Sequence, residues 1–427
     1  MKRLMPVLLW SAVSAAFIGP GTVATASAAG ARYGFSLLWA LVFSTIACLT
    51  LQEASGRLTA VAGLSLGDAM RRHFGRGVPL AVVGAVVLGC VAYEAGNILG
   101  AVAGAGLGLD LPKSILSLVT GLFAAALLWS GSPVQVARVL GIVVALMGVA
   151  FLICAADMRP DIETILEGCF VPQMPSGSGP ILLGLIGTTV VPYNLFLGSG
   201  LARGQSLRDI RVGLGVAVPL GGLISMGILV AGTAVDGELS YSVLADSLGD
   251  RLGSFALVLF SFGLFSAGLS SAVTAPLAAA LSVRSLREGD SEKWTDRSWR
   301  FRGVSLAVLG IGLIFGLSDI KPIPVIILAQ ALNGIILPLV AIFLLIATND
   351  RKLMGDENLN GLLANILIGI ASLVALLLGV SALMRATIAA VGADPPGQIV
   401  VLASAGVLAT ALAIPVVSQI RRRRKAS

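Results

Sequence analysis

Long apolar segments recur along almost the whole chain, and this pattern limits the fold more than any other feature. A helix that crosses a bilayer needs about 20 apolar residues, and its backbone polar groups must pair within the helix. The sequence therefore predicts an all-α membrane protein with about 12 transmembrane helices. We expect these spans near residues 6–30, 34–56, 78–107, 114–132, 134–156, 180–202, 211–234, 252–283, 302–317, 322–347, 361–384 and 397–418.

The composition excludes a water-soluble fold. Of the 427 residues, 56% are hydrophobic and only 12% are charged, whereas soluble domains carry about 25% charged residues. The 52 glycines suit helices that pack closely through small residues. The N-terminus, Lys2 and Arg3 before an apolar run, also resembles a signal peptide. Because many spans follow, a first helix that stays in the membrane is the simpler interpretation.

The basic residues predict the orientation of the chain. With the N-terminus inside, cytoplasmic segments hold 22 of the 29 Lys and Arg residues, as the positive-inside rule requires. This places the protein in the inner membrane with both termini cytoplasmic. The charges follow the alternation of the loops, so no nucleic-acid partner is expected. The bilayer itself is the expected partner of the basic run 421–425, which we expect against anionic lipid headgroups.

Two spans carry helix breakers at their centres. The first span contains Gly19, Pro20 and Gly21, and the sixth contains Gly187 and Pro192. Proline removes a backbone donor, and glycine costs about 1 kcal/mol relative to alanine inside a helix. Broken helices at membrane depth are tolerated where they line a cavity. Two ordinary proline kinks are the alternative interpretation.

The positions of the breaks predict an inverted repeat. Spans one and six cross the membrane in opposite directions, and matching interrupted helices in two halves indicate a substrate site at the midplane. We expect a single transporter domain with one five-helix repeat in residues 1–156, a second in 180–349, and two additional helices in 361–418. This organisation predicts a secondary transporter of a small solute.

Several segments resemble the NRAMP family of divalent-metal transporters. They are residues 51–58, 63–69, 192–197, 267–271, Gln330, 337–338 and 349–355. The resemblance implies a LeuT-like fold with helices 1 and 6 broken, which agrees with the repeat inferred above. It also implies transport of a divalent cation, with proton coupling.

The residues that bind metal in the family are replaced here. Gly19 stands where the family has Asp, Thr22 where it has Asn, Val191 where it has Met, and Tyr193 where it has His. Neutral oxygens favour a hydrated or harder cation such as magnesium over tightly selected manganese or iron. By position only, Gly19, Thr22, Thr188 and Gln330 would meet a metal. The resemblance implies a substrate site of Gly19, Thr22, Thr188, Val191, Tyr193, Asn194 and Gln330.

Two acidic residues lie within expected spans. Ionisable residues in a membrane are costly and usually functional. By resemblance, Glu94 with Asn97 is a candidate proton or cation relay, and a structural, hydrogen-bonded Glu94 is the alternative. Glu53 lies one turn before Arg57 near the cytoplasmic end, so an ion pair is expected there.

Two other functions are alternatives to divalent-cation transport. The Gly-rich first break also resembles transporters of amino acids or organic acids that share the LeuT fold, where helix N-termini hold a carboxylate. An enzyme needs a nucleophile, base or metal constellation in a cleft, and none is visible, since His73 is the single histidine and is expected in a solvated loop. The chain is therefore expected to be no enzyme, with no cofactor and no obligate protein partner.

Overall fold

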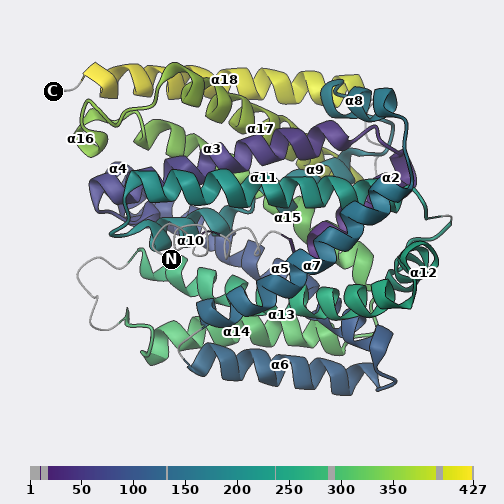
Figure 1. Cartoon of the computed structure of the whole chain (residues 1–427). Coiled ribbons are helices and arrows are strands. Elements are labelled where there is room, and N and C mark those ends of the chain that lie inside the picture. The colour runs from purple at the N-terminus through teal and green to yellow at the C-terminus, as the bar shows by residue number, and fades with distance from the viewer. Residues whose placement is uncertain are drawn as a thin grey trace.

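The computed structural model is a bundle of membrane helices that run roughly parallel (Figure 1). It describes residues 10, 18–130, 133–235, 237–286, 294–390 and 398–425. The first half of the expected first span, residues 6–17, lies almost entirely outside the described residues. The long helices are α3 (Leu38–Ala62), α5 (Gly77–Gly108), α6 (Lys113–Ser130), α7 (Pro133–Asp157), α11 (Leu207–Gly232), α13 (Ser254–Arg284), α14 (Trp299–Leu317), α15 (Pro322–Ala347), α17 (Leu362–Ala390) and α18 (Gln398–Lys425).

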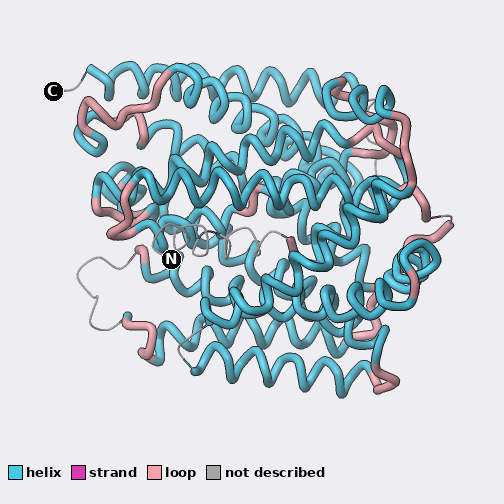
Figure 2. The backbone as a smooth tube through the Cα atoms, viewed as in Figure 1, coloured by secondary structure: helices cyan, strands magenta, loops and turns pink. Residues whose placement is uncertain are grey.

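The membrane character of the fold is confirmed. Within the described ranges, nine helical segments are long and apolar enough to cross a bilayer, and the two shorter apolar segments 113–129 and 141–157 match two further expected spans. The first span contributes α2 (Pro20–Tyr33), and the sixth contributes α9 (Gly179–Thr189) and α10 (Pro192–Ala202). Loops gather at the two ends of the bundle (Figure 2).

Four short helices in the connections were not predicted. They are α4 (Leu66–Phe74), α8 (Ile162–Phe170), α12 (Tyr241–Leu252) and α16 (Arg351–Met354). All four begin at a hydroxyl or carboxylate that accepts a backbone N–H; these caps are Ser65, Asp161, Ser240 and Asp350. In Figure 1, α4 and α16 lie at one end of the bundle and α8 and α12 at the other.

The helices approach closely at glycines. A Cβ on Gly30 of α2 would lie 2.0 Å from the Leu229 carbonyl oxygen of α11, and a Cβ on Gly268 of α13 would lie 2.5 Å from the Ala101 nitrogen of α5. A side chain at either glycine would therefore collide with the backbone of the neighbouring helix. These contacts fit the expected packing through small residues.

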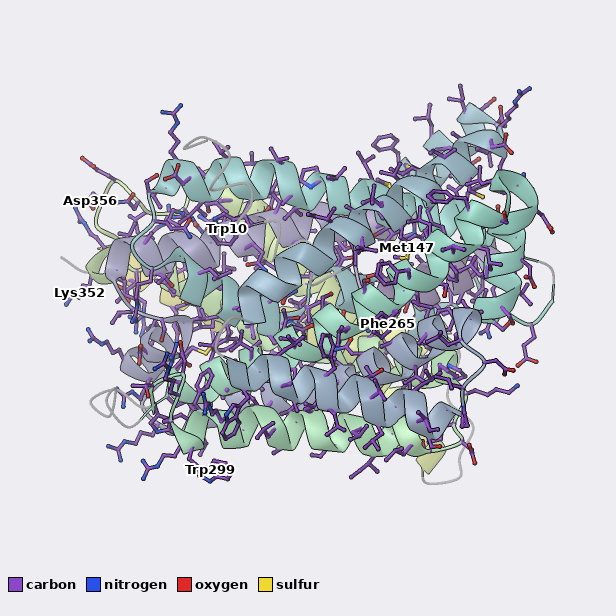
Figure 3. All side chains as sticks on the ribbon, turned by 60° about the horizontal axis from the view of Figure 1, so that its bottom comes forward. Trp10, Met147, Phe265, Trp299, Lys352 and Asp356 are labelled. Atoms are coloured by element: carbon purple, nitrogen blue, oxygen red, sulfur yellow. The ribbon has the colours of Figure 1, made fainter. Side chains whose placement is uncertain are left out.

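One expectation about the end of the bundle that holds α4 was wrong. His73 belongs to the helix α4 rather than to a loop, and its half-buried ring packs edge-on against Phe74 and Phe343. In the basic run 421–425, Arg423 bonds Asp350 and Arg424 bonds Asn349, so these two side chains contact protein, and the expected contact of the run with lipid headgroups stays a prediction. Figure 3 shows other polar residues of this end, Lys352 and Asp356, with Trp299 at the same end of the bundle.

Candidate functional site

The second expected break is present in the sixth span. α9 ends at Thr189 and α10 begins at Pro192, which leaves Val190 and Val191 outside both helices. Pro192 has no N–H to donate, which costs nothing at the first helical position but would remove a hydrogen bond inside a continuous helix. Both valines are 1% exposed. Irregular backbone therefore lies deep in the protein, and Val191 adds no ligand atom there.

The first span also begins a new helix deep in the protein. α2 starts at Pro20, and Gly19 before it is extended, with φ −111° and ψ −176°. The Gly19 carbonyl accepts the backbone N–H groups of Thr22 and Val23 at 3.0 and 3.2 Å. Any residue can adopt this backbone conformation, so a side chain at position 19 is not forbidden by the main chain.

The two breaks meet through their threonines. The hydroxyl of Thr22 on α2 lies 2.9 Å from the hydroxyl of Thr188 on α9, and both side chains are fully buried. This contact joins positions 166 residues apart in the sequence. Loop segments midway between the two ends of the bundle can be followed in Figure 2.

Gln330 of α15 lies against both broken helices. A Cβ on Gly21 of α2 would stand 2.0 Å from the Gln330 amide nitrogen, and a Cβ on Gly187 of α9 would stand 2.0 Å from its backbone oxygen. The two glycines are therefore required for this approach. The side chain of Gln330 is 1% exposed, so α15 supplies a third wall of the site.

A pair of tyrosines forms another wall. The rings of Tyr193 on α10 and Tyr93 on α5 meet edge to face, with centroids 5.3 Å apart. The Tyr93 hydroxyl lies beside Thr188 and Gln330. Tyr93 was not predicted as a site residue, and its position directly before Glu94 was the one signal that could have indicated it.

Several buried polar atoms at this junction have no partner among the described residues. They are the hydroxyls of Tyr93, Tyr193 and Ser271, the Oδ1 of Asn194 and the Oε1 of Gln330. Ser271 on α13, also missed from the sequence, lies 3.1 Å from where a Cβ on Gly19 would stand. Buried polar atoms in native proteins are normally hydrogen-bonded. This set offers neutral oxygens to a ligand that donates hydrogen bonds or carries positive charge.

The donor set does not fit a tightly held transition metal. Within the described parts of the chain, no group of three or more His, Cys, Asp or Glu side chains could hold a metal ion. The four free cysteines lie apart from one another, and Cys48, Cys90 and Cys154 are buried in the core. Soft metals favour thiolate, thioether or imidazole ligands, whereas magnesium and calcium favour oxygen.

Glu94 lies next to this junction but faces another helix. Its side chain is fully buried, and a Cβ on Gly312 of α14 would stand 2.5 Å from its Cγ. The Asn97 amide donates to Oε2 at 3.2 Å, while Oε1 has no partner among the described residues. Residues 93 and 94 therefore point in different directions, Tyr93 toward the broken helices and Glu94 toward α14.

The expected ion pair between Glu53 and Arg57 is confirmed. Arg57 Nε lies 3.1 Å from Glu53 Oε2, and Arg211 of α11 lies 3.0 Å from Glu53 Oε1. Arg57 also donates to Asn360 and to the Asn358 carbonyl. Glu53 is thus held by two cations and is separate from the junction of the breaks.

Residues 11–385 match the family model described as natural resistance-associated macrophage protein-like. The chain is 28% identical to a divalent metal cation transporter, MntH, of Deinococcus radiodurans over 378 residues, which cover 83% of this chain and 84% of that protein. It is 26% identical to a natural resistance-associated macrophage protein 2 homolog of Dictyostelium discoideum, over 81% of this chain and 58% of that protein.

Solved structures share the fold. A manganese transporter of Eremococcus coleocola superposes with a TM-score of 0.73 at 19% identity, over 98% of this chain and 95% of that one. Mhp1, a nucleobase-cation-symport-1 family transporter, superposes with a TM-score of 0.56 at 15% identity, over 98% of this chain and 92% of that one. The LeuT-like architecture expected from the sequence is confirmed, and the comparisons do not favour the amino-acid or organic-acid alternative.

Proposed function

Because the chain belongs to the Nramp family and is a multi-pass secondary transporter, we propose that it carries a divalent cation that keeps part of its water shell. The observation that carries this proposal is the junction of the two breaks, where the Thr22 and Thr188 hydroxyls meet and Gln330 packs against both broken helices. Among the described residues, no group of three or more His, Cys, Asp or Glu side chains could hold a metal ion. The related transporters whose names state a cargo move divalent metals or manganese.

The chemistry of the junction favours a hydrated ion. A bare divalent ion among neutral ligands would lack a counter-charge, and the loss of its water would be costly. Water bound to a cation is a strong hydrogen-bond donor, and Asn194 Oδ1 and Gln330 Oε1 are acceptors that lack partners among the described residues. Magnesium retains several waters when bound by proteins. It is therefore the cargo that this site fits best.

The charge of the outer face supports access of a cation from outside. In the proposed orientation, acidic residues outnumber basic ones on the non-cytoplasmic side, and a surface of one sign concentrates ions of the other. The basic residues there are Arg32, Lys113, Arg159, Arg251, Lys321 and Arg385; the acidic ones are Asp110, Asp157, Asp161, Glu163, Glu167, Asp236, Glu238, Asp246, Asp250, Asp319 and Asp394.

The proposed location is an inner membrane with both termini cytoplasmic. Its support is the excess of Lys and Arg in alternate connections. A fluorescent protein fused to the C-terminus should fold and fluoresce in the cytoplasm. A fusion that is active only on the other side would overturn this orientation.

The proposed organisation is two inverted repeats, residues 1–156 and 180–349, followed by helices in 361–418. In its support, α2 is the second half of span one, α9 is the first half of span six, and the two touch through Thr22 and Thr188. They lie toward the same end of the bundle (Figure 1). Residues 18–157 should superpose on 179–349 only after a two-fold rotation about an axis in the membrane plane.

Proton coupling through Glu94 is part of the proposal. A carboxyl fully buried among helices with a single amide donor is most stable as the neutral acid. It can accept and release a proton when the surrounding helices move. Its place beside the tyrosine pair puts this proton close to the cargo.

Uptake into proteoliposomes tests the cargo. Purified protein should take up magnesium in a saturable way, and manganese should compete only weakly. Absence of flux for magnesium, calcium, manganese and iron would overturn cation transport. Tight, saturable manganese uptake would overturn the hydrated site while leaving a cation transporter.

A further inference from the structure

A cavity opens at the non-cytoplasmic end of the broken first span. It has a volume of about 450 Å³ and lies between the last turns of α2, the loop before α12 and the start of α15. Ala28 and Arg32 line it from α2, Tyr241 from α12, and Lys321 and Pro322 from the third side. The α2 and α12 helices lie at the same end of the bundle in Figure 1.

Tyr241 forms the floor between this cavity and the break. Its side chain lines the cavity, but only 6% of the residue is exposed, and its hydroxyl donates to the Pro20 carbonyl at 3.3 Å. Pro20 is eight residues before Ala28 on one helix, a distance of about 12 Å along the axis. A residue of the outer helix α12 therefore reaches down to the first turn of α2.

The local structure holds Tyr241 in this place. Ser240 caps α12 by accepting the Val243 N–H at 3.1 Å, which fixes the first turn and the direction of the next side chain. Two residues before Ser240, Glu238 pairs with Lys321 at 2.6 Å and ties the loop to the start of α15 across the mouth of the cavity. Both charged side chains are highly exposed, so this pair positions the loop more than it stabilises it.

We propose that Tyr241 is the outer gating residue of the transporter. The cavity is the outer vestibule, and the ring of Tyr241 blocks passage from it to the junction at Thr22. One neutral hydrogen bond to Pro20 holds the ring, so the gate opens when α12 moves away from α2. This inference rests on the proposed function in one respect: it takes the junction at Thr22 as the site that the cargo reaches.

Cysteine labelling tests the gate without any cargo. The half-buried Cys169 of α8 is replaced by Ser, since the other three native cysteines are buried. Thr22→Cys then reports access to the junction from outside, with a membrane-impermeant methanethiosulfonate reagent on intact cells. We expect Tyr241→Ala to raise the labelling rate about tenfold or more, and Tyr241→Phe, which keeps the ring but loses the hydroxyl, to raise it a few-fold.

Ser242→Ala is the matched control, because Ser242 is the next residue of α12 and its exposed hydroxyl contacts only Ser240 among the described residues. It should label at the parent rate. Equal rates for the parent, Tyr241→Phe and Tyr241→Ala overturn the gate, as does an equal rise in Ser242→Ala. If Tyr241→Ala does not fold, the labelling rate of Tyr241→Phe relative to the parent tests the gate. A cargo panel that fails leaves the labelling result unaffected, so the two proposals are tested separately.

Discussion

The hydroxyl of Thr22 lies 2.9 Å from the hydroxyl of Thr188, and this single contact ties the break in the first span to the break in the sixth. Each hydroxyl can donate only one hydrogen, so one of the two oxygens keeps its acceptor sites for another partner. A ligand at the junction therefore meets a pair of coupled hydroxyls and not two independent ones.

We expect Thr22→Val and Thr188→Val each to reduce cation uptake about fivefold, because each removes one hydroxyl oxygen from the junction and breaks the contact between the two threonines. The loss of one neutral hydrogen bond corresponds to about 1 kcal/mol. The double variant should be little worse than either single one, since the two residues act as a unit. Uptake in proteoliposomes measures this.

Thr189→Val is the control for this pair. Thr189 is equally buried, but its hydroxyl bonds the Leu185 carbonyl within α9 at 2.9 Å. Uptake by this variant should stay near that of the parent. Strictly additive losses in the double variant would show that the two hydroxyls do not bind one cargo together.

A second prediction restores the ligand types of the family. We expect Gly19→Asp with Val191→Met to gain manganese binding at least about tenfold, because it adds a carboxylate and a thioether beside neutral oxygens. The extended backbone of Gly19 accepts a side chain, and the close neighbour is the movable hydroxyl of Ser271 at 3.1 Å from the new Cβ.

Calorimetry with manganese measures the gain. Gly19→Asp with Val190→Met is the matched control, since it carries the same groups with the methionine moved by one residue. A folded Gly19→Asp, Val191→Met protein that gives no more heat than this control would contradict the proposed alignment of the two breaks.

The sequence predicted the spans well because length and hydropathy alone decide whether a segment crosses a bilayer. Both breaks were predictable because proline and glycine occur together at Gly19–Gly21 and at Gly187–Pro192, and both residue types disfavour a continuous helix. The ion pair of Glu53 and Arg57 followed from their spacing on one helix face.

The inner walls of the site were not predictable in the same way. α5 is apolar on all sides, so no periodicity indicates which face meets the broken helices. Tyr93 and Glu94 differ by about 100° around the helix axis, and only tertiary packing decides that Tyr93 faces Thr188 while Glu94 faces Gly312. The charge of Glu94 made it a candidate in the sequence, whereas Tyr93 was not predicted as a site residue.

The short helices in the connections were missed because their polar residues interrupt the apolar pattern. The sequence of α12 does contain a helix signal. Ser240 is a residue type that often caps helices, and the apolar residues Tyr241, Leu244 and Leu248 follow it at helical spacing. Its first residue, Tyr241, is the one that reaches the break.

Glu94→Gln should separate proton flux from cation flux. We expect proton uptake that accompanies the cation to fall at least about tenfold, since an amide cannot release a proton, while downhill cation uptake stays within a few-fold of the parent. A pH-sensitive dye inside proteoliposomes and a cation assay measure the two fluxes together.

Glu53→Gln is the matched control, because Glu53 is the other acid within a span and is already paired with Arg57 and Arg211. Its proton flux should match that of the parent. Proton flux that persists in Glu94→Gln would remove Glu94 from the coupling path and leave it a structural residue.

Arg57→Ala should destabilise the protein by about 2–4 kcal/mol, because it leaves the Asn360 Oδ1 and the Asn358 carbonyl without the Arg57 donor and removes the more buried of the two cations that pair with Glu53. The Arg57 side chain is 5% exposed, whereas Arg211, which contacts the same carboxylate, is 58% exposed. Arg211→Ala should therefore cost only about 0.2–1 kcal/mol. Thermal unfolding in detergent compares the two, and equal losses would contradict this ranking.

The stability of the protein should depend on pH through His73 of α4. Burial, with a smaller contribution from the positive charge of Arg423, lowers the pKa of His73 from 6.5 to about 4, although Asp350 opposes the shift. Between these two values, the unfolded chain binds a proton that the folded protein does not bind. Stability therefore falls as the pH is lowered from about 6.5 toward 4, and His73 contributes no pH dependence above that window.

His73→Gln isolates this effect, because glutamine does not titrate while the carboxylates of the protein stay the same. Between pH 7.5 and pH 5, the midpoint of thermal unfolding should fall further for the parent than for His73→Gln. The half-exposed position of the ring means that solvent screens its charge, so a difference of a few degrees is expected rather than the full value of the shift. If both proteins lose the same amount, protonated His73 is accommodated in the fold, and its packing against Phe343 does not exclude the charged form.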